Sequence, residues 1–526
     1  MSQGAIAAGD PQTAEAGAAM LRRGGNAVDA VVAASFASFI AEAAIVNIGG
    51  GGVGLIADAT TRARAAYDFF SVMPSGPLTE QADFHEVLVD FGPEQQPFHI
   101  GRASVAVPGV VAGLCAMAAD HGTLPLPVLL EPAVHLADHG ARLSAGQEYA
   151  YGILQPIFVN TPELAQIYVP QGRRYQVGER MRFPQLAQTL ERLGQTGPDD
   201  FYTGALAQAI CADQAANHGL LTAADLAAYT VLRPAPIEIA YRGFTIVAMP
   251  PSSVGGVLIC FALRLLEGLA VGNHGHNSAH HARILAEVMR LTNLARPAWS
   301  GDERPLDERL TWFLSDAHVD RYRHQLIRLM DGADAPPEPT PYRGSNDTTH
   351  ISVVDSHGLH ASVTTSAGEN AGFVVGDTGI CLNNMLGEAD LHPQGFHAMA
   401  PGERLVTMMT PVVVEQDGRP ILAVGSGGSN RIRSAIVQVL SNVLDFAMPL
   451  QAAVDAPRFH FESGVLQAEG GIDADVVEKL QRRGYRVNLW PARNMFFGGA
   501  HAVGMLAGQL TAAGDGRRGG STVIIE

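Results

Sequence analysis

Two threonines stand between a proline-rich run and a predicted β-strand in the segment Asn346-Asp347-Thr348-Thr349-His350-Ile351-Ser352-Val353-Val354-Asp355. The run before it, residues 333–341, holds four prolines and lacks apolar periodicity, which predicts an exposed loop. Apolar residues after it, and a second run at residues 361–365, predict two strands joined by a turn through Ser356-His357-Gly358. The segment therefore predicts a threonine at the junction of a loop and a strand.

A threonine at such a junction gains a specific chemistry if the peptide bond before it is cut. The new α-amine has an ordinary pKa of about 8 and can take the proton from the threonine's own hydroxyl. One N-terminal residue then supplies both nucleophile and base, so no distant histidine is needed. The alternative is that Thr348 and Thr349 only begin an ordinary strand, where β-branched residues are favoured.

A series of glycine-rich and proline-containing motifs runs in order along the chain. They are Gly24-Gly25-Asn26-Ala27-Val28-Asp29-Ala30, Asn47-Ile48-Gly49-Gly50-Gly51-Gly52, Val107-Pro108-Gly109, Met249-Pro250-Pro251-Ser252-Ser253, Gly379-Ile380-Cys381-Leu382-Asn383-Asn384, Gly425-Ser426-Gly427-Gly428-Ser429 and Ala456-Pro457-Arg458-Phe459-His460. Together with the Thr348 segment, they resemble the γ-glutamyltransferase (γ-glutamyl transpeptidase) family of N-terminal-nucleophile hydrolases over nearly the whole chain.

The resemblance implies an α+β fold, a four-layer αββα sandwich. It also implies that the precursor cuts itself between Asp347 and Thr348, so that residues 1–347 and 348–526 become two associated subunits of one globular unit. The reaction implied is acyl transfer through a threonine ester, from a small-molecule amide to water or an amino acceptor, without a cofactor. Glutathione-like γ-glutamyl compounds are the default donors.

The resemblance also assigns the catalytic residues. Thr348 is the nucleophile, backbone N–H groups at Gly427 and Gly428 face the developing oxyanion, and Ser366 is a second hydroxyl that orients the nucleophile. Glycine suits the oxyanion position because it lets the backbone approach a ligand closely. Read from the residues alone, Gly427-Gly428 is a tight turn and Ser366 a strand-end serine bonded to backbone.

The acyl site implied by the resemblance consists of Asn383, Asn384, Glu388 and Thr407, and it departs from the family pattern. The stretch of residues 68–74 lacks the arginine that binds the donor's α-carboxylate in the family. Because a guanidinium makes two parallel hydrogen bonds to a carboxylate, its absence is expected to change substrate recognition. Glu388 replaces an aspartate that binds the α-amino group. Thr407-Met408 replaces a pair of serines.

These departures leave the acyl group open. Arg62, Arg64 and Arg102 are candidates to replace the missing arginine and bind the donor's carboxylate. The alternative for each is an ordinary charged side chain on the solvated surface. An amidase or acylase acting on a non-glutamyl amide is the alternative activity. A non-catalytic relative, which would remain one uncut chain, is a third class.

Composition and charge exclude several partners. With 526 residues, 47% hydrophobic and 17% charged, the chain can bury a large core, and its net charge of -17 argues against nucleic acid. The apolar helix predicted at residues 27–43 contains Asp29 and Glu42, so it is not expected to span a membrane. The start, Met1-Ser2-Gln3-Gly4-Ala5, has no signal-peptide pattern, which predicts a cytoplasmic protein.

Two other kinds of site were weighed. The histidines at 274, 276, 280 and 281 have a spacing that suits a shared metal ion, but the intervening glycine and asparagine favour a loop before a helix at residues 278–296, so no metal is expected. Residues 49–52 lack the Gly-Lys-Ser/Thr ending of a phosphate loop. The cysteines Cys115, Cys211, Cys260 and Cys381 have no paired spacing and are expected to be buried thiols.

Overall fold

Two six-stranded antiparallel sheets pack face to face in the computed structural model, which describes residues 3–90, 95–333, 348–392 and 394–526. In the first sheet the order is β21 (Ser521–Ile525), β1 (Gly4–Ala8), β10 (Thr349–Asp355), β11 (Leu359–Ser366), β2 (Gly51–Asp58) and β3 (Arg64–Phe69). In the second it is β20 (Gln509–Ala513), β19 (Gly499–Leu506), β15 (Arg419–Gly427), β14 (Val412–Gln416), β9 (Phe244–Ala248) and β8 (Ile237–Tyr241).

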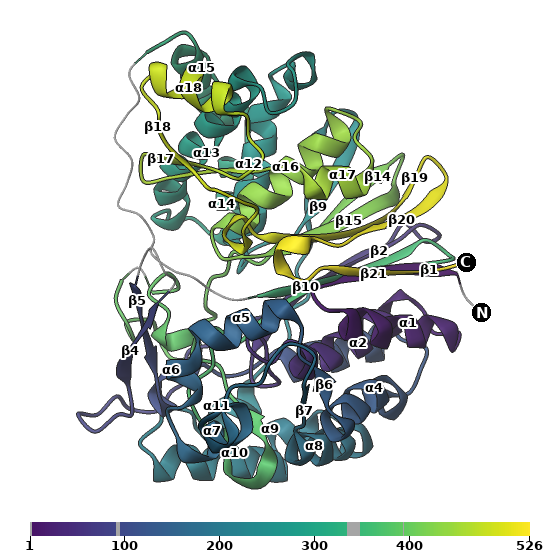
Figure 1. Cartoon of the computed structure of the whole chain (residues 1–526), viewed down its shortest axis with the longest axis vertical. Coiled ribbons are helices and arrows are strands. Elements are labelled where there is room, and N and C mark those ends of the chain that lie inside the picture. Colours follow the sequence, from purple (N-terminus) through teal and green to yellow (C-terminus); the bar gives the residue numbers. More distant parts are fainter. Residues whose placement is uncertain (1–2, 91–94, 334–347, 393) are drawn as a thin grey trace.

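Helices cover the outer face of each sheet, which completes the four layers (Figure 1). The first sheet is covered by α1 (Pro11–Arg22), α2 (Ala27–Ala41) and α3 (Val110–His121), with α4 (Leu126–His139) and α8 (Pro184–Thr196) beyond them. The second sheet is covered by α12 (Val254–Glu267), α16 (Arg431–Leu444) and α17 (Leu450–Asp455), with α13 (Ala279–Ser300), α14 (Leu306–Phe313) and α15 (Asp316–Met330) outside. The expected αββα sandwich is confirmed.

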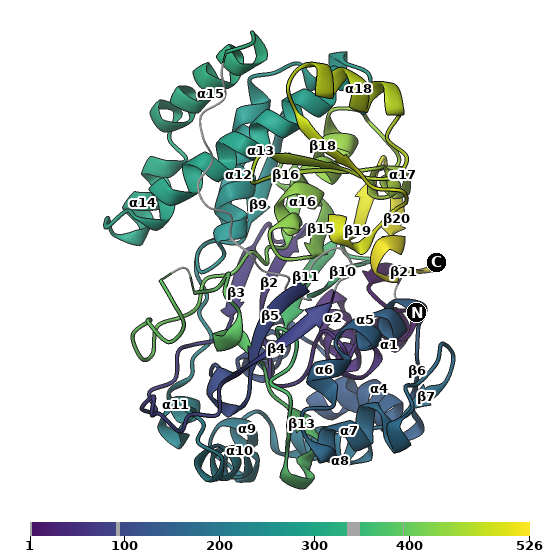
Figure 2. The ribbon, with the colours of Figure 1, turned by 60° about the vertical axis from the view of Figure 1, so that its left-hand side comes forward.

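Smaller elements surround these layers. The half that holds α1 also carries α5 (Ala145–Ile153), α6 (Gln155–Phe158), α7 (Pro162–Tyr168), α9 (Asp199–Tyr202), α10 (Ala205–Ala216), α11 (Ala223–Ala228) and the pairs β4 (His85–Asp90) with β5 (Gln95–Ile100), β6 (Ala141–Arg142) with β7 (Arg180–Met181) and β12 (Val374–Val375) with β13 (Ile380–Cys381). The other half carries β16 (Phe459–Glu462), β17 (Val465–Ala468), β18 (Arg486–Leu489) and α18 (Ala474–Arg482). Figure 2 shows the β4–β5 pair in front of the first sheet.

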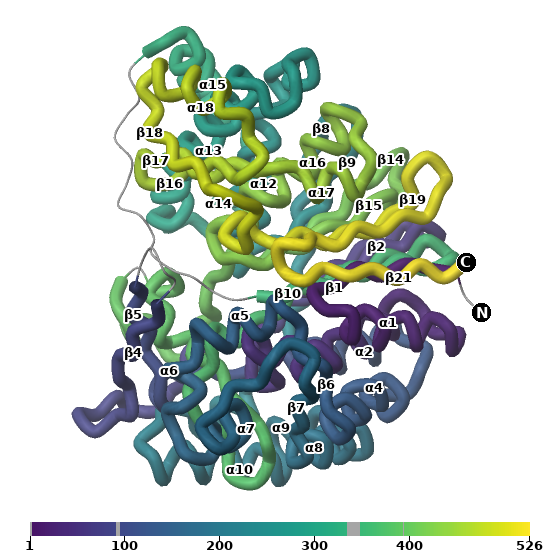
Figure 3. Tube along the Cα trace, in the orientation of Figure 1, coloured from purple at the N-terminus to yellow at the C-terminus, as the bar shows by residue number. Residues whose placement is uncertain are grey.

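The first and last strands of the chain pair with each other and flank β10. β1 is hydrogen-bonded to β10 on one side and to β21 on the other, and Figure 3 shows both chain ends at the same edge of the molecule. Because β10 lies inside the sheet, between the α2 layer and the second sheet, all seven of its residues are buried. The predicted pair of strands is confirmed as β10 and β11, whereas Asp347 and most of the proline-rich run lie outside the described residues.

Local sequence explains why α2 forms the layer beneath β10. Asn26 caps the helix by accepting from the backbone N–H groups of Val28 and Asp29, and the Asp29 carboxylate accepts the Asn26 N–H in return. Such a reciprocal cap satisfies backbone donors that the first turn leaves unpaired. Every residue of α2 is buried. No helix in the described ranges combines the length and apolar character needed to cross a membrane.

The cysteines are free thiols. Cys115, Cys260 and Cys381 are buried as expected, whereas Cys211 is half-buried because it lies on the partly exposed surface of α10. Burial raises the pKa of the Cys115 and Cys260 thiols to about 12, so both remain protonated.

A buried cluster of ions connects the second sheet to the segment leading into β21. Asp515 accepts from Arg458 at 2.7 Å and from Arg517 at 3.1 Å, and Arg517 also bonds to Glu469. These side chains are almost fully buried, and the two arginines lower the pKa of Asp515 to about 2 despite its burial. The Arg458 motif noted in the sequence is therefore part of the scaffold that fixes β21.

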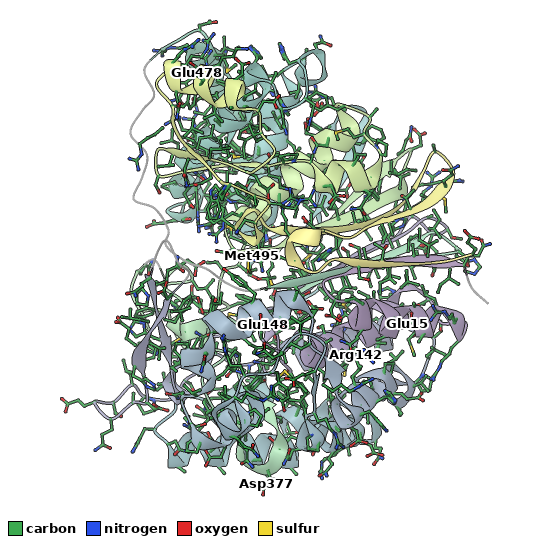
Figure 4. The ribbon with its side chains drawn as sticks, viewed as in Figure 1. Glu15, Arg142, Glu148, Asp377, Glu478 and Met495 are labelled. Atoms are coloured by element: carbon green, nitrogen blue, oxygen red, sulfur yellow. The ribbon has the colours of Figure 1, made fainter. Side chains whose placement is uncertain are left out.

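We expect Asp515→Asn to lower the free energy of unfolding by about 3–5 kcal/mol, because it leaves two buried guanidinium groups with one carboxylate fewer. Since the folded-state pKa is depressed, Asp515 stabilises the fold fully above its unfolded pKa of 3.8 and loses this effect as pH falls towards 2. Urea unfolding at neutral pH measures the difference. Asp377→Asn, on the exposed turn labelled in Figure 4, is the matched control, and equal midpoints for both variants would contradict the role of the cluster.

Candidate active site

Thr348 lies directly before β10 and opens on a pocket of about 430 Å³ between the two halves of the molecule. Its side chain is 2% exposed. The polar residues lining the pocket with Thr348 are Arg296, Ser366, Asp390, Thr407 and Ser429, and the apolar ones are Phe70, Met385, Leu391, Val406, Met408, Met409 and Ile432. The predicted nucleophile thus sits in a concave site with both polar and apolar walls.

Gly427, the last residue of β15, packs its backbone against Thr348. A Cβ at position 427 would lie 2.1 Å from the carbonyl oxygen of Thr348, so a larger residue does not fit. Gly428 follows with φ of 121°, a conformation that favours glycine, and Ser429 lies at φ 50°. The turn leads into α16, whose first N–H groups, on Arg431 and Ile432, donate to the carbonyl groups of Gly428 and Ser429 at 3.0 Å each. The positive end of this helix lies at the pocket wall formed by Ser429 and Ile432.

Ser366 and Thr407 both line the pocket beside Thr348. Ser366 ends β11 and its hydroxyl accepts the Gly368 N–H at 3.1 Å. The Thr407 hydroxyl accepts the Met409 N–H at 3.1 Å. Each hydroxyl therefore has a backbone partner that fixes its position next to the nucleophile.

Asn383 and Asn384 use their amides mainly to hold backbone. The Asn383 Nδ2 group donates to the carbonyl groups of Gly49 at 2.7 Å and Ala106 at 2.9 Å, and its Oδ1 accepts the N–H groups of Ala106 and Met385. Asn384 accepts the Glu369 N–H and donates to the carbonyl oxygen of His99. These bonds position Met385, which does line the pocket.

Glu388 is buried next to Gly368, where a Cβ would lie 3.0 Å from its Oε1 atom. The residues that line the described pocket are Met385, Asp390 and Leu391 from this segment, with Glu388 and the two asparagines behind them. Direct contact of Asn383, Asn384 and Glu388 with a substrate stays a prediction.

The three arginines considered for the vacated carboxylate site are engaged or exposed elsewhere. Arg64 bonds to Glu415, Arg102 bonds to Asp213, and Arg62 lies on the surface. The stretch without an arginine contributes Phe70 to the pocket wall. Arg404 donates to the Phe70 carbonyl oxygen at 2.6 Å, which holds the backbone of this stretch.

Arg296 and Asp390 bring a positive and a negative side chain into the pocket, and sequence reasoning missed both. Arg296 comes from α13 and donates to Asn430 Oδ1 at 3.3 Å. Asp390 accepts from the Ser429 hydroxyl at 3.1 Å, and burial raises the pKa of its carboxyl. Asp390 follows Glu388 by two residues, but nothing in the sequence connects it to an arginine on a distant helix.

Glu42, at the C-terminal end of α2, is the second missed feature. It is 1% exposed and accepts hydrogen bonds from Thr13 at 2.7 Å and from Thr349 at 2.6 Å. Burial, followed by the nearby Asp10 carboxylate, raises the pKa of Glu42 to about 7. Thr349, the residue after Thr348, is therefore held by a buried acid that lies 307 positions earlier in the sequence.

His350, the third residue of the Thr-Thr-His sequence, faces the second sheet and lies outside the pocket. Its ring hydrogen-bonds with Thr364 and Ser352 at 2.8 Å each, and complete burial lowers its pKa far below the usual value. A Cβ on Gly425 would lie 2.2 Å from this ring. His350 is therefore a neutral packing residue between the sheets.

The histidines at 274–281 have contacts within the protein. His281 accepts the Asn277 N–H, His276 bonds to Asn442, and the rings of His274 and His280 lie against each other at a tilt of 32°. Throughout the described ranges no group of three or more His, Cys, Asp or Glu side chains is arranged to hold a metal ion.

Comparison with known proteins gives consistent matches over the whole chain. The family model described as gamma-glutamyltranspeptidase matches residues 13–525. The Acylase ACY 1 proenzyme of Pseudomonas sp. (strain SE83) is 34% identical, covering 100% of this chain and 94% of its own length. The glutathione hydrolase proenzyme of Escherichia coli (strain K12) is 31% identical, covering 93% of this chain and 86% of its own length. The crystal structure of cephalosporin acylase from Bacillus halodurans superposes with a TM-score of 0.85 at 25% identity, covering 100% of this chain and 96% of that chain.

The Glu42 carboxyl predicts a pH-dependent stability that is measurable on the Thr348→Ala chain. Because the folded-state pKa is raised from 4.5 to about 7, the stabilisation is complete below pH 4.5 and is lost as pH rises through 7. We expect the free energy of unfolding to fall by an amount on the order of 3 kcal/mol over this pH range. Glu42→Gln in the same Thr348→Ala chain should remove most of this pH dependence.

Melting temperatures recorded at matched scan rates test this expectation. Glu15→Gln, on the exposed face of α1 labelled in Figure 4, is the control and keeps the parent's pH dependence. A pH profile that is the same with and without the Glu42 carboxyl would contradict the assignment.

Proposed function

The chain belongs to the gamma-glutamyltranspeptidase family, and from this premise we propose that it is a self-processing acyltransferase or amidohydrolase with Thr348 as its nucleophile. The relatives are named as hydrolases and acylases, and several are named proenzymes. The observation that carries the assignment of Thr348 is its position at the start of β10, beside Gly427 and inside the pocket.

Maturation requires one scission at the bond between Asp347 and Thr348. The Thr348 hydroxyl attacks the Asp347 carbonyl, the peptide nitrogen leaves as the new α-amine, and water hydrolyses the resulting ester. The products are residues 1–347 and 348–526, which stay associated because β1 and β2 of the first are hydrogen-bonded to β10 and β11 of the second. A single event thus creates both the nucleophile and its base.

Turnover uses the same two groups. The α-amine of Thr348 takes the hydroxyl proton as Oγ attacks the donor amide carbon, and that proton passes to the departing amine. Water or an amino acceptor then attacks the ester and releases the acyl group. Among the described lining residues the titratable side chains are Arg296 and Asp390, so the α-amine is the general base in this scheme.

The oxyanion forms next to the turn at Gly427 and Gly428. Backbone N–H groups there, and the N-terminus of α16, present positive potential to the pocket at Ser429 and Ile432. Loss of one such donor typically raises a barrier by about 2.7–4 kcal/mol. Ser366 and Thr407 line the same pocket, where their hydroxyls can contact the nucleophile and the acyl group.

Small γ-glutamyl amides are the default donors, and an acylase acting on a non-glutamyl amide is the second candidate. The second candidate is favoured by the apolar part of the pocket wall, where Phe70, Met385 and Met408 replace polar contacts implied by the family pattern. The apolar wall suits the methylene chain of either acyl group.

The Thr348→Ala variant tests the proposal. We expect one full-length polypeptide on a denaturing gel and an amide-hydrolysis rate reduced by at least about 10⁴-fold, because both the nucleophile and the scission are lost. N-terminal sequencing of the shorter wild-type fragment should begin at Thr348.

The Thr348→Ser variant is the matched comparison, since it keeps a hydroxyl and should retain both scission and turnover at reduced rates. A Thr348→Ala chain that still hydrolyses amides would disprove the mechanism. An uncut wild-type chain without activity would instead support a non-catalytic binding role.

A further inference from the structure

A second pocket, of about 390 Å³, lies between α12, α13, α16 and β16. These elements lie together in the half of the molecule that holds the second sheet (Figure 1). Ile432 of α16 lines the pocket of Thr348, whereas Arg433 and Val437 of the same helix line this second pocket. The two pockets are therefore different sites, and the proposed mechanism uses the pocket of Thr348 alone.

The wall of the second pocket is mostly apolar. Its apolar residues are Leu258 and Ala262 from α12, Leu285, Val288 and Met289 from α13, Val437 from α16 and Phe461 from β16, and its polar residues are Thr292, Asn293, Asn430, Arg433, Ser434 and His460. Burial lowers the pKa of His460, so its ring is neutral at neutral pH. Among these lining residues Arg433 therefore supplies the charge.

In the described parts of the chain, the guanidinium of Arg433 is hydrogen-bonded to no carboxylate, although the residue is 8% exposed. Its Nη1 and Nη2 atoms both donate to Asn293 Oδ1, at 3.3 Å each, and its Nε atom is buried without a hydrogen-bond partner. A guanidinium has five N–H donors, so two long bonds to one neutral oxygen leave several donors without an acceptor. A buried charge in this state is costly, and it is a position where a ligand acceptor contributes much.

The carboxylate of Glu462, which attracts Arg433 electrostatically, is hydrogen-bonded to other groups. It accepts from Asn430 Nδ2 at 3.1 Å and pairs with His460 Nε2 at 3.3 Å. Burial, followed by the like charge of Arg296, lowers the pKa of Arg433 to about 10, and Glu462 acts in the opposite direction. Arg433 therefore stays protonated at neutral pH, and its charge favours an anion in the pocket.

We propose that this pocket binds a short aliphatic monocarboxylate, whose carboxylate accepts two parallel hydrogen bonds from Arg433 and whose alkyl chain packs against the apolar wall. The planar guanidinium matches a carboxylate in geometry as well as in charge. Leu258, Val288 and Val437 offer the alkyl chain an environment without water. A second negative charge on the ligand is disfavoured, because it would be buried against these side chains and near Glu462. The site does not depend on the proposed function.

Three small molecules test the ligand class on the wild-type protein. Butyrate has the carboxylate and the alkyl chain, butyramide has nearly the same shape without the charge, and succinate carries a second carboxylate. We expect butyrate to bind at least about tenfold more tightly than either of the other two. Isothermal titration calorimetry in a chloride-free buffer measures the three affinities, since chloride would compete for the guanidinium.

Two substitutions locate the bound butyrate. Arg433→Met removes the charge and keeps an apolar side chain of similar length, and Ala262→Leu fills the apolar part of the pocket without changing Arg433. We expect each to weaken butyrate binding by at least about tenfold. The matched control is Arg283→Met on α13, because Arg283 is also 8% exposed but donates to the Leu329 carbonyl and is not among the residues that line the pocket. This variant should keep the wild-type affinity.

Phe70→Ala, in the wall of the Thr348 pocket, separates the two sites and should also keep the wild-type affinity. A loss in this variant as large as that in Arg433→Met would place the carboxylate beside Thr348 and overturn the proposal. Equal binding of butyrate and butyramide by the wild-type protein, or no binding of butyrate, would also overturn it and leave water as the partner of Arg433. None of these results bears on scission at Thr348, so the proposed function is judged separately.

Discussion

The contact between the Gly427 backbone and Thr348 constrains the rest of the structure. A Cβ at position 427 would lie 2.1 Å from the Thr348 carbonyl oxygen, so the end of β15 in one sheet rests directly on the start of β10 in the other. This contact joins the two sheets at the point where the nucleophile lies. It also places the turn at Gly428 and the N-terminus of α16 next to Thr348. In the proposed mechanism negative charge develops there on the carbonyl oxygen of the substrate, which needs hydrogen-bond donors.

Buried polar side chains lie on both faces of β10 next to that contact. Below β10, Glu42 at the end of α2 holds Thr349, and its raised pKa shows how strongly this environment resists charge. Above β10, His350 is kept neutral between Ser352 and Thr364. In the proposed mechanism the base is a group created by chain scission, because side chains buried next to Thr348 do not readily carry the charge that proton exchange requires.

The pocket combines polar groups around Thr348 with a partly apolar wall. Ser366, Thr407 and the glycine turn surround Thr348, while Phe70, Met385 and Met408 make one side apolar. The charges instead come from Arg296 and Asp390, which are brought together by the packing of α13 against α16 and the loop after β13.

Sequence by itself determined the class of fold, the strand pair β10–β11, the helix α2 and the position of Thr348, because these depend on local periodicity and on motifs that recur in a fixed order. It also supplied Ser366, Thr407 and the Gly427-Gly428 turn as neighbours of the nucleophile. Only the tertiary structure decided that Glu42 holds Thr349 across 307 positions of sequence, and that Arg296 reaches the pocket. The physical reason is that a buried charged side chain interacts with the groups that the packed layers bring within a few ångströms of it. Residues that become neighbours in this way are far apart in the sequence, so no local pattern predicts the contact.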